Sequence, residues 1–422
     1  MSPYRRKLEE LYTLEFFGMK LGLENITALL EFLGRPDRRF PSVHVAGTNG
    51  KGSVSAMLAA VHQVAGYKTG LYTSPHLVDF RERIRIDGEM ISEEEVVSFL
   101  ERVWEKAKEL RATFFEVTTA MAFDHFSRHA VDRAIIETGL GGRLDSTNVL
   151  EHPLATVITS IGFDHMAQLG PTLEAIAAEK AGIFKSGVPA VVNVARDLEP
   201  VFKRRAAEVH APLHFVRQHE RALARDRYWQ SSFAGRHQAE NVRTVRTALR
   251  AMGSTISVRD ARHGIREASL LTGLRGRLEE IVSPELEKRT IRLMIDVGHN
   301  AQAFERTRDF FRAHRIRPIV VAGIMKDKEI PAVLKIVKSF ARSFVAVQAH
   351  TDRALPSREL ANAVTSAGLA AVDGGAVLDG LSKAIRQAKK GDTLLLTGSH
   401  YVVGEFLENF QRTGKVNTLG AQ

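Results

Sequence analysis

Cysteine is absent from the 422 residues of this sequence. Disulfide bridges, thiolate nucleophiles and cysteine-ligated zinc or iron–sulfur sites are therefore excluded, and any metal must be bound by oxygen and nitrogen ligands. Long hydrophobic runs are also missing, because stretches such as 188–192 and 318–325 are far shorter than the ~20 apolar residues that a membrane span needs. We therefore expect no membrane-spanning segment and no membrane partner.

The first residues are basic, but Glu9 and Glu10 interrupt the part that would be apolar in a signal peptide. We therefore expect a cytoplasmic protein. The formal net charge is +10, which suits nucleic acid, a membrane surface or a small polyanionic substrate. The basic residues lie on helices that also carry acids, as in 101–106, and this argues against a nucleic-acid-dependent ATPase.

The order of hydrophobic patterns predicts an α/β fold. Short β-branched runs alternate with stretches of helical period, which is typical of mostly parallel sheets. In the first part of the chain we expect strands at 42–46, 69–72, 133–137, 155–160 and 189–194. Helices are expected at 52–65, 92–110, 117–128 and 172–181.

A second alternating set begins near Thr290. We expect its strands at 291–296, 319–323, 343–347 and 393–397, and helices at 303–313 and 359–366. The polar, proline-containing stretch 283–289 is interpreted as a linker. The pattern therefore predicts a P-loop-type, mostly parallel sheet domain over residues 1–284 and a smaller Rossmann-like α/β domain over residues 285–422.

The strongest local signal is a glycine-rich turn between a buried strand and a helix. It comprises Gly47, Thr48, Asn49, Gly50, Lys51, Gly52 and Ser53. Glycines let backbone N–H groups approach phosphate oxygens, Lys51 supplies a mobile cation, and Ser53 can hold Mg²⁺. The spacing departs from the usual Walker sequence, and the alternative is an ordinary strand-to-helix turn. The combination of residues favours a phosphate-binding loop.

Charged and imidazole groups follow two of the expected strands. Glu137 ends the strand at 133–137, and His165 follows the strand at 155–160. Ligand sites in open α/β sheets lie at such strand ends, so both side chains can face the phosphate-binding loop and bind a metal. Taken singly, Glu137 could be a loop carboxylate, His165 a structural histidine, and Lys180 a lysine that complements the C-terminus of a helix.

Two further stretches, 235–241 and 296–300, place short polar side chains beside a predicted helix and after a predicted strand. Such side chains can reach a nucleotide base and ribose. Each stretch by itself is equally well explained by turn chemistry.

In this order the motifs resemble the folylpolyglutamate synthase and dihydrofolate synthase family, within the Mur ligase superfamily. The resemblance spans nearly the whole chain and rests on residues 21–24, 47–53, 73–77, 81–84, 115–116, 137–148, 164–165, 179–183, 237–238, 276–277, 296–300 and 327–328. It implies an ATP-dependent amide ligase of folate biosynthesis and one-carbon metabolism. In such an enzyme, ATP phosphorylates a carboxylate, and the amine of L-glutamate attacks the acyl phosphate.

The resemblance also implies roles for single residues. Ser53 and Glu137 would bind one Mg²⁺, while Glu137, His165 and a carbamylated Lys180 would hold a second ion. Lys51, with Glu137, His165 and Lys180, would be catalytic. Beyond the loop 47–53, the implied ATP contacts are Asn241, Arg277, Asp296 and His299.

The resemblance further implies that the activated carboxylate belongs to dihydropteroate, with folylpolyglutamate extension as a second activity. The implied folate contacts are Met19, Leu21, Phe115, Asp145 and Ser146. Lys328 and Ser399 match places where related ligases bind their incoming amino acid, here glutamate. The alternative is a Mur-type ligase that acts on another carboxylate, and we expect a monomer without a nucleic-acid partner.

Overall fold

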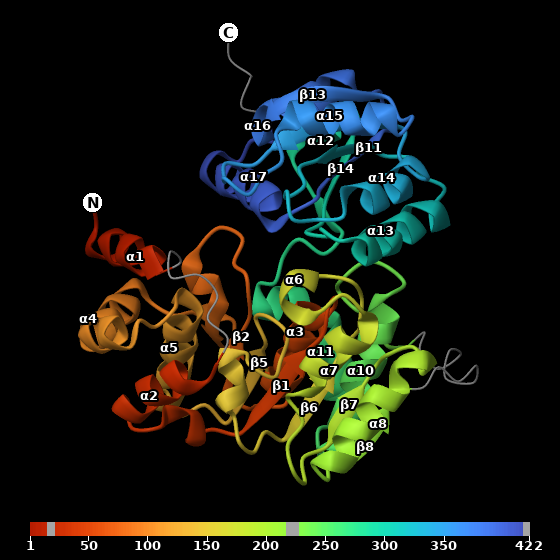
Figure 1. Ribbon diagram of the computed structural model, residues 1–422. Coiled ribbons are helices and arrows are strands. Elements are labelled where there is room, and N and C mark those ends of the chain that lie inside the picture. The colour runs from red at the N-terminus through yellow and green to blue at the C-terminus, as the bar shows by residue number, and fades with distance from the viewer. Residues whose placement is uncertain (15–21, 217–227, 417–422) are drawn as a thin grey trace. The chain divides into compact units, whose positions relative to one another are not determined.

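The computed structural model describes residues 1–14, 22–216 and 228–416 (Figure 1). The chain forms two compact units. Unit 1 comprises Met1–Pro75, Arg81–Ser232 and Ala239–Leu274, and unit 2 comprises His76–Phe80, Phe233–Gln238 and Arg275–Gln422. Each unit has one mostly parallel sheet, which confirms the predicted α/β class. A bilayer-crossing helix is not found among residues 1–14, 22–216 and 228–416.

Unit 1 is built on an eight-stranded sheet in the order β4-β3-β2-β5-β1-β6-β7-β8. The strands are β1 (Ser42–Ala46), β2 (Thr69–Tyr72), β3 (Ile84–Ile86), β4 (Glu89–Met90), β5 (Arg133–Glu137), β6 (Ala155–Ile158), β7 (Ala190–Val192) and β8 (Leu213–Phe215). β1 is buried along its whole length and pairs in parallel with both β5 and β6. The carboxyl ends of these three strands therefore lie side by side at one edge of the sheet.

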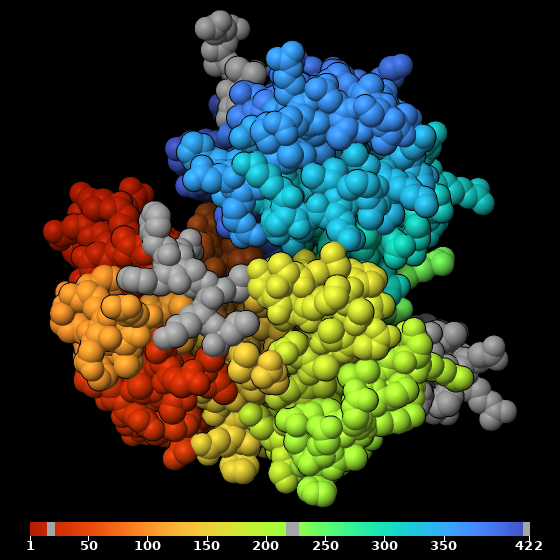
Figure 2. All heavy atoms as spheres, viewed as in Figure 1, coloured from red at the N-terminus to blue at the C-terminus, as the bar shows by residue number. Residues whose placement is uncertain are grey.

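The helices of this part of the chain are α1 (Pro3–Thr13), α2 (Glu24–Phe32), α3 (Lys51–Val64), α4 (Glu93–Leu110), α5 (Phe114–Arg128), α6 (Met166–Leu169), α7 (Leu173–Ala181), α8 (Glu199–Glu208), α10 (Gln238–Ala251) and α11 (Val258–Thr272). Short 3₁₀ turns include η4 (Ser146–Val149). α3 packs against β1, β2 and β5, and α11 lies along α3. α7 and α8 share a core with β6 and β7. In the space-filling view, this part of the chain forms a continuous yellow-to-green surface (Figure 2).

Unit 2 contains a six-stranded sheet in the order β13-β12-β11-β14-β10-β9. Its strands are β9 (Glu279–Ile281), β10 (Arg292–Ile295), β11 (Ile319–Ala322), β12 (Ser343–Gln348), β13 (Ala371–Ala376) and β14 (Thr393–Thr397). Its helices are α12 (Pro284–Arg289), α13 (Ala301–Ala313), α14 (Ile330–Lys338), α15 (Ser357–Ser366), α16 (Val377–Gln387) and α17 (His400–Thr413).

Successive residues along the strands of unit 2 contribute their side chains to two separate hydrophobic cores. Leu293 and Ile295 of β10 join the core that contains residues of α16 and α17. Met294, between them, joins the core that contains residues of α13, α14 and α15. Because successive strand residues point to opposite faces, helices cover both sides of this sheet, as expected for a Rossmann-like arrangement.

The predicted strands 42–46, 69–72, 133–137 and 393–397 are confirmed residue for residue. The predicted linker at 283–289 is wrong, because residues 284–289 form α12. The Ser283 hydroxyl accepts the N–H of Leu286 at 3.3 Å, and Pro284 occupies the first turn. Serine at the N-cap and proline in the first turn are typical of the start of a helix. The linker interpretation was based on the same two residues, because both are also common in loops.

Unit 2 also includes residues 275–284, which precede the predicted domain boundary in the sequence. The physical reason is that β9 pairs antiparallel with β10 and so belongs to the second sheet. The boundary at 284 and 285, taken as the limit of an independently folding segment, stays a prediction.

Candidate active site

The glycine-rich turn joins the end of β1 to the start of α3 at the central strand of unit 1. Gly50 caps α3 with φ of 89°, in the left-handed region that glycine adopts without strain. A Cβ at Gly47 would come within 1.9 Å of Thr159 Oγ1, so that position requires glycine for space as well. The first N–H groups of α3 follow this turn directly, as in an anion-binding helix N-terminus.

The turn is held by the segment that follows β6. The N–H of Thr48 donates to the carbonyl oxygen of Ser160 at 2.6 Å, and the Thr48 hydroxyl exchanges hydrogen bonds of 3.1 Å with Gly162. The hydroxyl groups of Thr159 and Ser160 both donate to the carbonyl oxygen of Asn49, at 2.7 and 3.0 Å. The shape of the loop is therefore fixed before any ligand binds.

Two lysines meet at this loop. Lys51 Nζ donates to the carbonyl oxygens of Gly47 at 3.2 Å and Thr48 at 3.4 Å. Lys180 Nζ donates to the same Gly47 oxygen at 2.8 Å and is 4% exposed. Lys180 is therefore a buried neighbour of the loop, which a lysine that only complements a helix terminus would not be.

Burial and the nearby Lys51 ammonium lower the pKa of Lys180 to about 7, against the opposing effect of Asp164 and Asp145. Asp145 lies in the segment after β5, and Asp164 lies in the segment after β6. Because both carboxyl groups act on the Lys180 charge, both segments approach Lys180. Near neutral pH, a substantial fraction of the Lys180 amine is uncharged.

Oxygen donors suited to a hard divalent cation lie at the ends of β5 and α3. Glu137 is 4% exposed at the last position of β5, and Ser53 is 1% exposed in the first turn of α3. The N–H of Ser74 donates to Glu137 Oε2 at 3.4 Å. The neighbouring Thr138 Oγ1 is buried with no hydrogen-bond partner. This donor set fits Mg²⁺, which prefers carboxylate, hydroxyl and water oxygens.

His165 is the N-cap residue of α6 with φ of 51°, and about a third of its side chain is exposed. Its backbone N–H donates to Asp164 Oδ1 at 3.0 Å. The predicted second metal set takes ligands from Glu137, His165 and Lys180. It stays a prediction, as do the catalytic roles of these residues.

Of the predicted folate contacts, Phe115 lies on the first turn of α5 against the loop that follows Glu137. A Cβ at Gly139 would come within 2.4 Å of the Phe115 ring, and the Tyr72 ring lies 6.1 Å away between centroids. Ser146 is buried at the start of η4. Met19 and Leu21 lie outside the described residues.

Asp145 is tied into its own loop. Its Oδ2 accepts the N–H of Leu140 at 2.7 Å, and its Oδ1 accepts the N–H and hydroxyl of Thr147 at 3.0 and 2.5 Å. Burial raises its pKa above the ordinary range, although these hydrogen bonds oppose the shift. Any substrate bond to Asp145 would add to this network.

Asn241 lies near the start of α10 and belongs to unit 1. A Cβ at Gly50 would come within 2.8 Å of Asn241 Oδ1, so this amide lies directly against the glycine-rich turn. Its contact with ATP stays a prediction.

The other predicted ATP contacts lie in unit 2, after β10. Asp296 accepts the N–H of Gly298 at 2.9 Å and that of Leu278 at 3.0 Å. Burial raises the pKa of Asp296, whereas the Arg277 guanidinium opposes the increase. His299 Nδ1 bonds the Val297 carbonyl oxygen at 3.0 Å. Arg277, Asp296 and His299 are thus grouped around the end of one strand.

The predicted glutamate contacts also follow strands of unit 2. Ser399 comes after β14 and caps α17, where its hydroxyl accepts the N–H of Val402 at 3.1 Å. The Lys328 ammonium lies 3.7 Å from Asp327 Oδ2, and its side chain is only 8% exposed. Since β11 and β14 are parallel neighbours, both residues follow strands that end at the same edge.

Sequence reasoning missed two features. The hydroxyl groups of Thr159 and Ser160 that fix the glycine-rich turn carry no signal beyond their place after a strand. A cluster of Glu95, His125 and His129 was also missed, although the spacing of the two histidines on a predicted helix would have indicated one face.

Comparisons with known proteins show the family of the chain. The family described as Mur ligase middle domain matches residues 45–259, and the Mur ligase glutamate ligase domain matches residues 276–400. The dihydrofolate synthase/folylpolyglutamate synthase of Bacillus subtilis (strain 168) is 34% identical over 418 residues, covering 92% of this chain and 95% of that protein.

Solved structures are also similar to this chain over most of its length. The structure of E. coli FolC in complex with DHPP and ADP is 30% identical, with a TM-score of 0.83, and covers 97% of this chain and 98% of that chain. A bifunctional folylpolyglutamate synthase/dihydrofolate synthase with Mn, AMPPNP and L-glutamate bound is 28% identical, with a TM-score of 0.80 and coverage of 97% and 98%.

Proposed function

The chain belongs to the dihydrofolate synthase/folylpolyglutamate synthase family of ATP-dependent Mur ligases, and on that premise we propose that it joins L-glutamate to dihydropteroate. Extension of folates with further glutamate is its second proposed activity. The observation that carries the proposal is the convergence of the glycine-rich turn, Lys180 and the loop after Glu137 at one edge of the sheet. We further propose that the enzyme acts as a cytoplasmic monomer.

The proposed reaction activates a carboxylate that is otherwise a poor electrophile. A carboxylate oxygen attacks the γ-phosphorus of ATP, ADP leaves, and the glutamate amine then attacks the acyl carbon and expels phosphate. The N–H groups of the turn and the Lys51 ammonium would hold phosphoryl oxygens and stabilise their charge. Preformed hydrogen bonds around Thr48 and Asn49 support this role, because a rigid loop needs little reorganisation during the reaction.

Mg²⁺, when bound, would neutralise negative charge on the phosphate groups. Ser53 and Glu137 are the residues proposed to hold it. A second ion is proposed at Glu137, His165 and a carbamylated Lys180. Carbamylation joins the Nζ of the neutral Lys180 amine to the carbon of CO₂ with loss of one N–H proton, and the product is an anionic group with oxygen ligands. The burial of Lys180 beside the loop supports this proposal.

Residues beyond the turn complete the proposed ATP contacts: Asn241 against Gly50, and Arg277, Asp296 and His299 in unit 2. The proposed folate contacts are Met19, Leu21, Phe115, Asp145 and Ser146. The position of Phe115 against Gly139 supports an aromatic contact beside the loop that follows Glu137.

Replacement of Asp145 distinguishes substrate recognition from loop structure. Asp145→Ala is expected to impair dihydropteroate ligation more than glutamate extension of tetrahydrofolate, because a carboxylate can accept N–H bonds from the pterin ring. Initial rates with each substrate measure this ratio. Asp145→Asn, which keeps one oxygen acceptor for Thr147, is the control for loop structure. Equal loss of both activities in both variants would assign Asp145 to the loop alone.

Lys328 and Ser399 are proposed to bind the carboxylates of the incoming glutamate. Lys328→Ala is then expected to raise the KM for glutamate by about tenfold or more, since a charged hydrogen bond is lost, and to leave the KM for ATP unchanged. Lys326→Ala is the matched control, because Lys326 is an exposed lysine two residues away. An unchanged KM for glutamate in the Lys328 variant would remove both residues from the site.

A comparison of acceptors tests the proposed substrate. The full-length protein is supplied with ATP, Mg²⁺ and L-glutamate, and with dihydropteroate, tetrahydrofolate or a muramyl peptide in separate reactions. We expect ligated product from dihydropteroate, and also from tetrahydrofolate. Product from the muramyl peptide alone would instead identify a Mur-type ligase of another carboxylate.

A further inference from the structure

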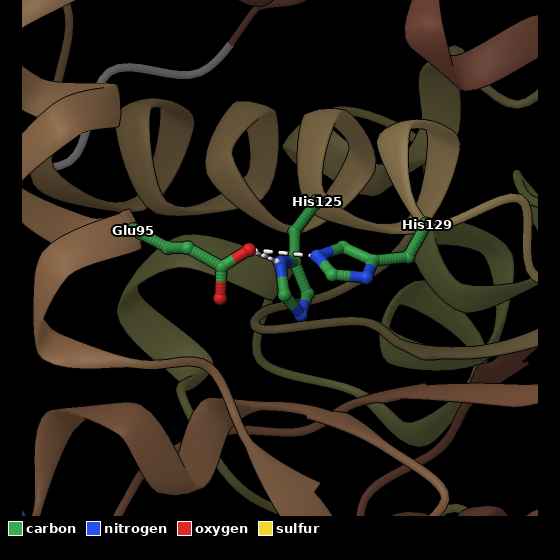
Figure 3. A group of neighbouring side chains, drawn as sticks. All are labelled: Glu95, His125 and His129. Atoms are coloured by element: carbon green, nitrogen blue, oxygen red, sulfur yellow. Dashed lines mark hydrogen bonds and ion pairs between the residues drawn. The ribbon is translucent and has the colours of Figure 1, made fainter.

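Three potential metal ligands converge between α4 and α5, away from the residues discussed above. Glu95 lies in the first turn of α4, and His125 and His129 lie one turn apart at the end of α5. Figure 3 shows the three side chains pointing toward one another from these two helices. Among the described residues, this is the one group of three or more His, Asp or Glu side chains whose ligand atoms all lie within 4.8 Å of one another.

The separations are close to those of a metal site. His129 Nε2 lies 2.7 Å and His125 Nδ1 lies 3.4 Å from Glu95 Oε1. Ligand atoms around a tetrahedral Zn²⁺, with bonds of about 2.1 Å, are about 3.4 Å apart. Small side-chain rotations would therefore admit an ion between the three groups. The two imidazole rings already face each other, with centroids 4.5 Å apart.

Glu95 is held in place by the capping of its own helix. Its Oε2 accepts the backbone N–H of Ser92 at 3.3 Å, and the Ser92 hydroxyl accepts the N–H of Glu95 at 3.1 Å. This capping box leaves Oε1 directed at the histidines. Hydrogen bonds that orient a ligand in this way are typical of metal centres.

One of the two histidines is buried between the helices. The imidazole of His125 is 7% exposed, so the ring is largely shielded from solvent. The adjacent carboxylate of Asp124 is paired with the Arg102 guanidinium at 2.5 Å. Glu95 Oε1 is the carboxylate oxygen that faces the two imidazole rings, and both rings can supply nitrogen ligands.

We propose that Glu95, His125 and His129 bind Zn²⁺ or a similar first-row divalent ion, with water completing the coordination. Two nitrogen ligands and one carboxylate suit such an ion, whereas Mg²⁺ and Ca²⁺ prefer oxygen ligands throughout. The ion would join the start of α4 to the end of α5 and so stabilise unit 1. The alternative is a metal-free hydrogen-bond network between the same helices.

The test is a calorimetric titration of the full chain with Zn²⁺, after treatment with chelator and without nucleotide. A His165→Ala background removes the imidazole of the candidate active site, so that binding there is suppressed. We expect zinc binding in this background that becomes at least tenfold weaker when His129→Ala is added. The matched control is His152→Ala, which removes another exposed histidine of unit 1 and should leave the affinity unchanged.

A second measurement separates binding from loss of structure. Trp104 and Trp229, the two tryptophans of the sequence, both lie in unit 1, so their fluorescence reports its unfolding. Zn²⁺ is expected to raise the Tm of the His165→Ala protein by several degrees, and Mg²⁺ is not. Glu95→Gln, which retains a residue that suits a capping box, should abolish the rise. Equal zinc affinity with and without His129, or an undiminished rise in the Glu95 variant, would overturn the proposal.

Discussion

Lys51→Ala is expected to lower the rate of ligation by ~10²-fold or more while the Tm stays near that of the wild type. Lys51 is the first residue of α3, and its ammonium donates to carbonyl oxygens of the preceding turn. It is not a core residue, so its loss removes little packing. Phosphoryl transfer depends on cations placed at the phosphate groups, and the effect should therefore fall on turnover.

Steady-state ligation and thermal unfolding of the same preparation measure both parts of this expectation. Lys68→Ala is the matched control, since Lys68 is an exposed lysine of unit 1 that precedes β2. Near-normal turnover in the Lys51 variant would contradict the assignment of the glycine-rich turn as the phosphate site.

Lys180→Ala is expected to abolish most of the ligation activity. If Lys180 is carbamylated, its replacement removes a metal ligand, which should cost at least the ~10–100-fold that loss of a supporting partner costs at metal sites. ¹³C-bicarbonate NMR of the wild type should then show a carbamate signal that the variant lacks. Added acetate should partly restore activity, because it supplies the missing oxygen ligands.

Lys185 offers a matched control for the acetate experiment. It is also a partly buried lysine with a pKa lowered by burial, and its Nζ donates to a backbone oxygen, that of Asn148, at 2.9 Å. Acetate should not rescue any defect of Lys185→Ala. A fully active Lys180→Ala enzyme would leave one metal at Ser53 and Glu137, and His165 would then be a structural histidine.

The order of elements could be predicted from sequence because buried parallel strands are short, apolar and bounded by turns. β1, β2, β5 and β14 were predicted exactly for this reason. β13, with Asp373 and two glycines, resembles a turn in sequence and forms a strand because β12 pairs with it. Tertiary pairing, which a local pattern does not contain, decides such cases.

The candidate site also has residues that the sequence could indicate and contacts that it could not. Gly47, Lys51 and Glu137 were proposed from sequence because each lies at or just after the end of a recognisable strand. The burial of Lys180 against the Gly47 carbonyl could not be predicted, since its local pattern is that of an ordinary helix end. The internal bonding of Asp145 was equally hidden, because it depends on how residues 140–147 fold back on themselves.

The most direct test of the central claim follows the oxygen atoms of the substrate. Dihydropteroate labelled with ¹⁸O in its carboxylate is incubated with the enzyme, ATP, Mg²⁺ and L-glutamate, and the released phosphate is analysed by mass spectrometry. An acyl phosphate requires the attacking carboxylate oxygen to leave with phosphate, so we predict labelled phosphate in proportion to the amide formed. Unlabelled phosphate accompanying amide formation would contradict the acyl-phosphate mechanism.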